Sequence, residues 1–174
     1  AARCAEQEWA RRGAIGSVAQ TAQDLEQAIT KRATEGAAKY GAAGKEVVTP
    51  DAAFTTLMQR PSMQRAMARA KEIASESGET FEATQGNYPV KSLHYVKLAL
   101  DDMIKNPERF ALGKTEERAI AKTQQSFVDW LGKQSPAYAE ARESFAAASA
   151  PINQMQVGQE LEKALTSASG ATER

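Results

Sequence analysis

The chain has 174 residues, which is long enough for one domain with a substantial core or for two small helical halves. Lys+Arg and Asp+Glu both number 22, so the net charge is zero and the basic excess of a tight nucleic-acid binder is missing. The single cysteine, Cys4, excludes an internal disulfide, and no apolar run approaches the ~18 residues that a membrane span needs.

A long helix is predicted over roughly residues 5–40. Its apolar side chains alternate steps of three and four residues, which is coiled-coil spacing, until Arg32 takes the next position. Gly36, Gly41 and Gly44 are predicted to end this helix. So narrow a stripe needs another surface, and we expect that surface to be a neighbouring copy. The predicted partner-binding residues are Ile15, Val18, Ala22, Leu25 and Ile29.

Prolines and glycines divide the middle of the chain. The run Glu46-Val47-Val48-Thr49 is the only β-like one. Thr49 is predicted as an N-cap with Pro50 at the first helical position, and Pro61 opens the following helix. The apolar positions of these two helices are Phe54, Leu57 and Met58, and then Met63, Met67, Ala70, Ile73 and Ala74. Periodicity disappears between Ser75 and Pro89, which predicts a long loop and the best internal boundary.

The second half shows cleaner helical periodicity. One helix is striped by Leu93, Val96, Leu100, Met103 and Ile104 and stops at Asn106-Pro107. Thr115 is predicted to cap the next helix, whose apolar face holds Ile120, Phe127, Trp130 and Leu131. Ser135 caps a helix over residues 138–148, and Pro151 begins a last helix that ends near Leu165. We expect Leu100, Ile104, Phe127 and Trp130 to be buried together.

These patterns predict an all-α protein with about seven helices. The long helix and a helical hairpin occupy residues 1–75, and residues 76–89 form a loop and boundary. A compact helical bundle follows over residues 90–166, and residues 167–174 are a frayed tail.

Residues with catalytic or metal-binding chemistry are scarce. His94 is the only histidine, and a Gly-x-Ser-x-Gly elbow, which would present a nucleophilic serine, is absent. One cysteine and one histidine cannot form a zinc site of the usual spacing. His94 is therefore interpreted as an ordinary helix residue beside Tyr95. We predict no catalytic residue, no cofactor and no metal ligand, and hence a protein that is not an enzyme.

Two other motifs receive a structural interpretation. The segment Gly41-Ala42-Ala43-Gly44-Lys45 is similar to a phosphate-binding loop, but it follows a helix and lacks the serine or threonine after the lysine. It is interpreted as a glycine loop that ends a helix. Arg60, Arg65, Arg69 and Lys71 form the only basic cluster, which is interpreted as a solvated helix face.

A resemblance to a known class of proteins extends over about residues 88–165. The segments that carry it are Tyr95 to Ile104 (YVKLALDDMI), Phe127 to Leu131 (FVDWL), Ser135 to Arg142 (SPAYAEAR) and Gln156-Val157-Gly158. Their succession resembles a segment of large helical internal or DNA-ejection proteins from the virions of tailed bacteriophages and prophages. The resemblance implies a structural virion protein, packaged inside the particle and released with DNA into the host envelope or cytoplasm. Its implied partners are copies of itself and portal or tail components.

Two alternatives stay open. Gly13 to Gln20 is similar to a Gly-Ala-x-Gly-Leu-Met-Gln segment of the lytic transglycosylases, which cleave peptidoglycan. The catalytic glutamate of that family precedes the segment, whereas Glu76 and Glu143 follow it here, and a general-acid glutamate also needs an apolar pocket. The second alternative is a cytoplasmic helical adaptor encoded in a prophage.

Overall fold

The structure is a computed structural model that describes the backbone of residues 2–170 and the side chains of residues 20–161 and 163. Residues 171–174 of the predicted frayed tail lie outside the described residues. Residues 167–170 belong to the last helix.

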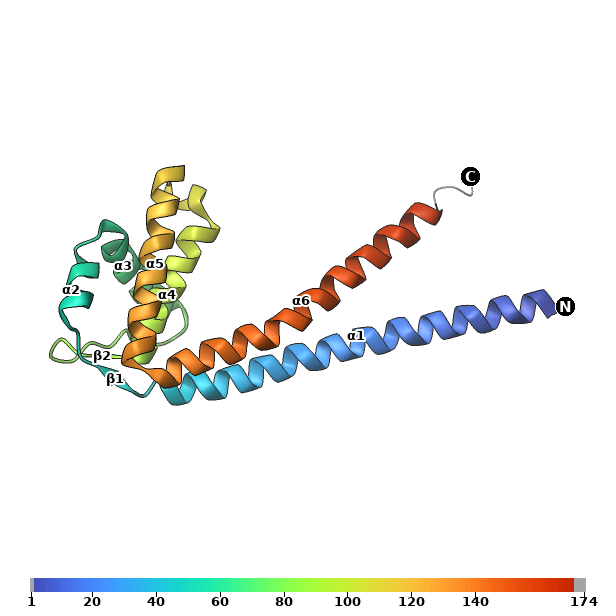
Figure 1. The fold of residues 1–174 in the computed structure, drawn as a ribbon, viewed down its shortest axis with the longest axis horizontal. Helices are drawn as coiled ribbons and strands as arrows, with labels where there is room; N and C mark the ends of the chain where they lie inside the picture. The colour runs from blue at the N-terminus through green and yellow to red at the C-terminus, as the bar shows by residue number, and fades with distance from the viewer. Residues whose placement is uncertain (1, 171–174) are drawn as a thin grey trace. The chain divides into compact units, whose positions relative to one another are not determined.

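The all-α class is confirmed (Figure 1). The α-helices of the described chain are α1 (Ala2–Ala43), α2 (Ala52–Met58), α3 (Pro61–Glu76), α4 (Val90–Lys105), α5 (Lys114–Gln134) and α6 (Pro136–Gly170). A short 3₁₀ helix, η1 (Pro107–Phe110), follows α4. The only strands among the described residues are β1 (Val47–Val48) and β2 (Tyr88–Pro89), which form an antiparallel pair.

The predicted break at Pro151 is wrong, and this is why residues 2–170 contain six α-helices and not about seven. Pro151 lies inside the continuous helix α6. A proline within a helix removes one hydrogen bond, to the carbonyl four residues earlier. Pro151 and Ala147 are both exposed, so water can donate to that carbonyl in place of the missing N–H group. Ser149 Oγ also donates to the Phe145 carbonyl at 2.7 Å within the same turn.

The chain divides into two units at positions that differ from the predicted boundary. Residues 37–142 form one compact unit, the core unit, and residues 1–36 with 143–174 form the other, the helical unit. The predicted boundary at 76–89 falls inside the core unit. The loop there does not separate domains, because α3 and α4, which flank it, pack against each other.

The two-stranded pair positions the C-terminal end of that loop. Val47 pairs with Pro89 and Val48 with Tyr88, so the predicted β-like run does form a strand. The Val90 N–H donates to the Glu46 carbonyl at 2.8 Å, and the Lys91 N–H donates to the Gly44 carbonyl at 3.2 Å. These bonds hold the beginning of α4 beside the segment that follows α1.

The core lies between α2, α3, α4 and α5, and it contains the predicted cluster. Leu100, Phe127 and Trp130 are buried as expected, whereas Ile104 is only partly buried and packs against the cluster from outside. Burying a side chain of this size contributes roughly 1.5–3 kcal/mol relative to its exposure in water. Other buried members are Phe54, Leu57, Met63, Leu93, Val96, Met103, Ile120, Val128 and Leu131.

Two helix starts differ from prediction by a few residues. The N-cap of α2 is Asp51 and not Thr49, since its carboxylate accepts from the Phe54 N–H at 2.9 Å. Helix α5 begins after Gly113 and not at Thr115, because the Glu116 carboxylate accepts from the Gly113 N–H at 2.9 Å. Carboxylates suit both positions because the exposed N–H groups of a first helical turn carry partial positive charge.

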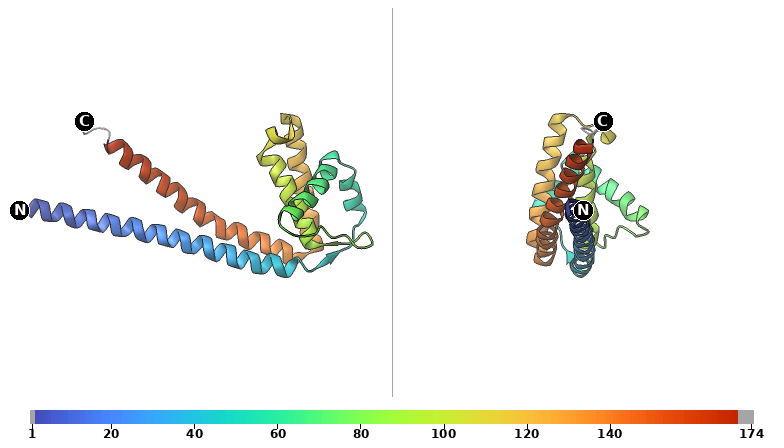
Figure 2. Two further views of the ribbon diagram at one scale, coloured as in Figure 1. Left: turned by 180° about the vertical axis from the view of Figure 1, so that it is seen from behind. Right: turned by 90° about the vertical axis from the view of Figure 1, so that its right-hand side faces the viewer.

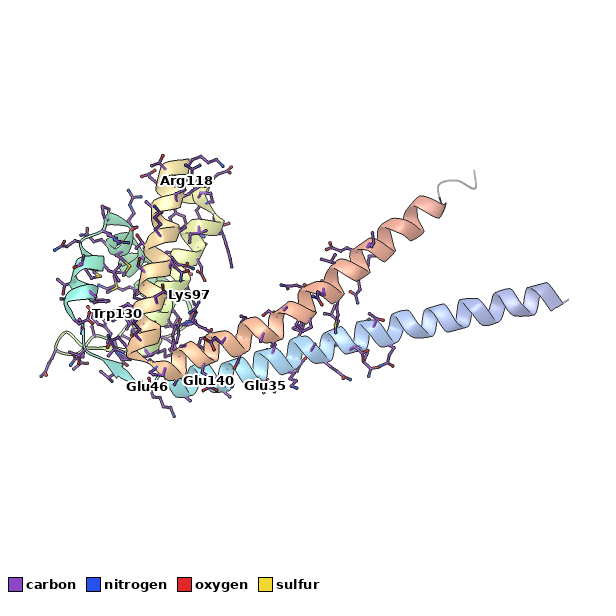
Figure 3. All side chains as sticks on the ribbon, in the orientation of Figure 1. Glu35, Glu46, Lys97, Arg118, Trp130 and Glu140 are labelled. Atoms are coloured by element: carbon purple, nitrogen blue, oxygen red, sulfur yellow. The ribbon has the colours of Figure 1, made fainter. Side chains whose placement is uncertain are left out.

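Asp51 also connects α2 to α5. Its carboxylate accepts from Trp130 Nε1 at 2.9 Å and from Gln134 Nε2 at 3.1 Å. The Trp130 ring lies on the side of α5 that faces α2, with its centroid 4.7 Å from that of Phe54 (Figure 3). One side chain therefore caps a helix and satisfies the indole N–H of a buried tryptophan.

The helical unit consists of the larger parts of both α1 and α6. The two helices run antiparallel; they lie side by side near residues 36 and 143 and diverge towards residues 2 and 170 (Figures 1 and 2). Among residues 20–36, 143–161 and 163 of this unit, Gly36 and Ile152 alone are buried. The α1 portion of 35 residues corresponds to a length of about 50 Å at 1.5 Å per residue.

Candidate interaction surface

Contacts between α1 and α6 concentrate around Arg32 in the helical unit. Arg32 Nη1 donates to Ser149 Oγ at 3.1 Å, and the guanidinium carbon lies 5.0 Å from the Phe145 ring centroid. Gly36 permits this close approach, because a Cβ there would stand 3.0 Å from Phe145 Cδ2. Arg32 Nε is buried without a hydrogen-bond partner, which costs stability. A polar residue at a stripe position can fix the register of two helices at such a cost.

The predicted partner-binding stripe is only partly visible. Side chains of Ile15 and Val18 lie outside the described residues. Ala22 is exposed, and Leu25 and Ile29 are partly buried. The three-four spacing of the stripe continues through Arg32 and Gly36, which both contact α6.

Residues at this spacing share one side of a helix, so Leu25 and Ile29 lie on the side of α1 that faces α6. The pairing within the chain therefore uses part of the stripe that the sequence assigns to a partner. Whether a partner also contacts it stays a prediction.

A second apolar surface was missed by the sequence reasoning. Val157 is 65% exposed and Leu161 is 60% exposed, one helical turn apart on α6. Ile152, by contrast, is buried on the same side of α6 as Ser149, which contacts α1. At about 100° per residue, Val157 and Leu161 lie roughly opposite Ile152. The i, i+4 spacing of two large apolar residues amid polar ones was the available signal, but the resemblance drew attention only to the letters Gln156-Val157-Gly158.

His94 has more partners than predicted. Its Nδ1 lies 2.9 Å from the Tyr138 hydroxyl, and its ring centroid lies 4.9 Å from that of Tyr40. Tyr40 and Tyr138 are in edge contact, with centroids 5.7 Å apart. The three rings, the ring cluster, join α1, α4 and α6 within the core unit. No local sequence pattern could reveal this cluster, because its members are far apart in the chain.

Burial governs the ionisation of the ring cluster. It lowers the pKa of His94 to about 4, with the positive charge of Lys97 acting in the same direction and Asp101 opposing both. Burial also raises the pKa of Tyr138 and the pKa of Tyr40. At neutral pH the three groups are therefore uncharged, as expected for ionisable side chains in an apolar environment.

The basic cluster is less solvated than predicted. Only 15% of the Arg69 side chain is exposed, and its guanidinium lies 2.8 Å from Glu72, 3.6 Å from Glu76 and 3.5 Å from Asp102. The hydrogen bond to Glu72 is the main reason why the pKa of Arg69 is raised. Arg60 donates to Thr123 Oγ1 at 3.2 Å, whereas Arg65 and Lys71 are exposed.

The two glutamates weighed for transglycosylase chemistry are both on exposed helix surface. Glu76 is the last residue of α3, and its carboxylate lies 3.6 Å from the Arg69 guanidinium. Glu143 is exposed on α6. A general acid needs the opposite environment, an apolar pocket that keeps the carboxyl protonated.

Within the described part of the chain, no three His, Cys, Asp or Glu side chains gather where they could hold a metal ion. None of the described helices combines the length and the hydrophobicity that crossing a membrane requires. Comparison of the chain with models of protein families, with curated proteins and with solved structures gives no match.

Proposed function

We propose that this chain is a non-enzymatic structural protein that assembles with copies of itself through the helices of its helical unit. The observation that carries this proposal is the exposed pair Val157 and Leu161, which stands on the side of α6 away from α1. Large apolar side chains gathered on one side of a helix are typical of a surface that another helix covers.

The helical unit has little internal support. Among the residues of this unit whose burial is described, only Gly36 and Ile152 are buried, so two long helices share a very small core. Helices in water gain most of their stability from packing an apolar face and little from intrinsic propensity. A second pair of helices packed against Val157 and Leu161 would supply the missing burial.

A copy of the same chain is the partner that the composition favours. The chain has zero net charge, so two copies do not repel each other strongly. The exposed pair Lys31–Glu35, 3.9 Å apart, places both signs of charge on the surface of the helical unit. In a symmetric contact, the lysine of one copy can therefore lie opposite the glutamate of the other. The apolar surface formed by Val157 and Leu161 is also narrow, so the partner surface that fits it best is a helix and not a sheet or a flat surface.

The assembly proposal is tested by sedimentation or light scattering over a range of concentrations. Val157→Asp combined with Leu161→Asp should convert an oligomer into a monomer, while the near-UV circular dichroism of the core unit stays unchanged. Val47→Asp is the matched control, since Val47 is 64% exposed but lies in the core unit. A wild-type chain that stays monomeric at every concentration contradicts the proposal.

Leu25→Asp with Ile29→Asp probes the originally predicted stripe. Because these residues lie on the side of α1 that faces α6, the change should loosen the helix pair as well as the assembly. Hydrogen exchange in residues 20–36 and 143–161 should then accelerate, whereas α4 and α5 stay protected. Loss of association with unchanged exchange would place the stripe in the contact between copies instead.

We propose further that the working place of this assembly is the interior of a phage particle, from which the protein is released with DNA. The support is the resemblance over about residues 88–165 and the balanced charge, which allows packing beside DNA without tight binding. Mass spectrometry of purified particles from the strain that encodes the chain tests this. Its absence from particles that contain their other structural proteins contradicts the placement but not the assembly itself.

A further inference from the structure

A cavity of about 440 Å³ lies in the core unit, beside the ring cluster. The end of α1, the first half of α4 and the beginning of α6 surround it. Tyr40, His94 and Tyr138 line one part, Gly41 lines another, and Lys45 and Lys91 add two positive charges. No acidic side chain is among the lining residues that the structure describes. The volume falls within the usual range for small-molecule sites.

The ring cluster presents a hydrogen-bond donor to this cavity. Tyr138 is 1% exposed, and His94 Nδ1 is its only recorded partner among the described residues. Its hydroxyl proton is therefore satisfied only if the phenol donates to Nδ1. The neutral imidazole must then carry its own proton on Nε2. No described residue bonds to Nε2, and His94 lines the cavity, so this N–H group is left for a ligand there.

The two lysines differ in how strongly they are already engaged. Lys45 is exposed, and no ion pair is recorded for it within the described chain. Lys91 contacts the Glu79 carboxylate, yet 55% of its side chain remains exposed. An anion at the cavity would therefore meet one uncompensated ammonium group, a second that is shared with Glu79, and the His94 N–H donor.

We propose that this cavity binds a small planar carboxylate, with its apolar body against the ring cluster and its carboxylate beside Lys45 and Lys91. Aromatic walls favour a flat apolar body, and charge-assisted hydrogen bonds from the ammonium groups favour an anionic end. The His94 Nε2–H group donates to the same carboxylate. This ligand site is separate from the assembly surface and does not depend on it.

The binding experiment uses naphthoate as the probe and the full chain as the protein. Naphthoate should shift the ring signals of Tyr40, His94 and Tyr138 in nuclear magnetic resonance spectra, in a saturable way. Naphthalenemethanol has the same rings without the charge, and it should bind about tenfold more weakly or worse, as expected for loss of a charge-assisted contact.

Three variants assign the binding to the cavity. Lys45→Gln with Lys91→Gln should weaken naphthoate binding about tenfold, while Lys71→Gln with Lys133→Gln, two exposed lysines elsewhere in the core unit, should not change it. His94→Phe keeps a ring and removes the donor, so binding should weaken by a smaller factor. A Cβ added at Gly41 meets no atom within 4 Å, so Gly41→Leu should fold normally and reduce binding by occupying space.

Several results would overturn the proposal. One is the absence of saturable shifts in the ring cluster. Another is equal affinity for naphthoate and naphthalenemethanol, and a third is equal affinity of the two lysine double variants. If Gly41→Leu fails to fold, the lysine pair and His94→Phe still decide the question.

Discussion

The core unit and the helical unit are both built mainly from helices but are stabilised in different ways. In the core unit, α4 and α5 bury Leu93, Leu100, Phe127 and Leu131 completely. In the helical unit, two much longer helices bury only Gly36 and Ile152 among the residues whose burial is described. Helix length therefore does not indicate stability, because packing against other elements contributes most of it. The core unit has its partners within the chain, whereas the helical unit leaves apolar surface uncovered.

The largest effect should come from truncating the core. Phe127→Ala is expected to lower the free energy of unfolding by about 3–5 kcal/mol, because the ring is fully buried and a cavity would remain. Leu161→Ala, at a position 60% exposed, should change it by about 0.5 kcal/mol or less in dilute solution. Urea unfolding followed by circular dichroism measures both. Equal losses at the two positions would remove the contrast between the units.

A second effect is acid sensitivity confined to the core unit. The pKa of His94 is about 4 in the folded chain, whereas the ordinary pKa of a histidine is 6.5, so the unfolded chain takes up the proton first as pH falls. The stability that the neutral His94 imidazole contributes is fully present above about pH 6.5. It is lost progressively as the pH falls to about 4, and the total loss is roughly 3 kcal/mol.

The contribution of His94 is isolated by comparing the chain with His94→Phe in urea unfolding at about pH 7 and about pH 5. The variant should lose less stability between these two values, because it has no imidazole to protonate. Identical losses would show that other groups cause the acid sensitivity.

Pro151 offers a way to strengthen the helical unit alone. Pro151→Ala should stabilise α6 locally by about 2 kcal/mol, since a helix penalty of ~3 kcal/mol is partly offset by the freedom that proline removes from the unfolded chain. Amide hydrogen exchange around residues 147–155 measures the gain. Pro136→Ala is the control, because a proline in the first turn of a helix costs little. Equal slowing by both changes contradicts the explanation.

The smallest effect concerns Asp51. Its hydrogen bond from the Phe54 N–H is the main cause of its lowered pKa, and the Trp130 indole N–H acts in the same direction. Because its pKa is lowered in the folded chain, the ionised Asp51 stabilises the fold at pH values above 3.8, the ordinary pKa of an aspartate. This stabilisation is lost as the pH falls through the pKa of Asp51 in the folded chain. Asp51→Asn should lower the melting temperature slightly at neutral pH and not at about pH 2. Asp129→Asn, a change of an exposed aspartate on α5, is the control for the substitution itself.

The sequence predicted what depends on local spacing. Apolar stripes placed α3, α4 and α5, and Asn106-Pro107 marked the end of α4. Features that depend on distant contacts were missed. Asp51 rather than Thr49 caps α2, and its carboxylate also accepts from Trp130, which is 79 residues away.

Two other misses have the same physical origin. Pro151 is tolerated in α6 because its side of the helix faces solvent, a fact that the local sequence does not contain. The boundary at 76–89 was expected from a loss of periodicity, but a loop separates domains only when the helices on either side lack mutual contacts. The His94 partners, Tyr40 and Tyr138, lie at least 44 positions away and could not be inferred from any motif.

The ring cluster also has a consequence for the order of folding. Contacts between residues distant in the chain form slowly, because the intervening segment loses conformational freedom when it closes. α3 and α4 are neighbours in sequence and can dock early, whereas Tyr40 and Tyr138 meet only when both ends of the core unit have arrived. Closure of the core unit around His94 should therefore be a late step. Substitutions in the ring cluster should then accelerate unfolding while leaving the refolding rate nearly unchanged.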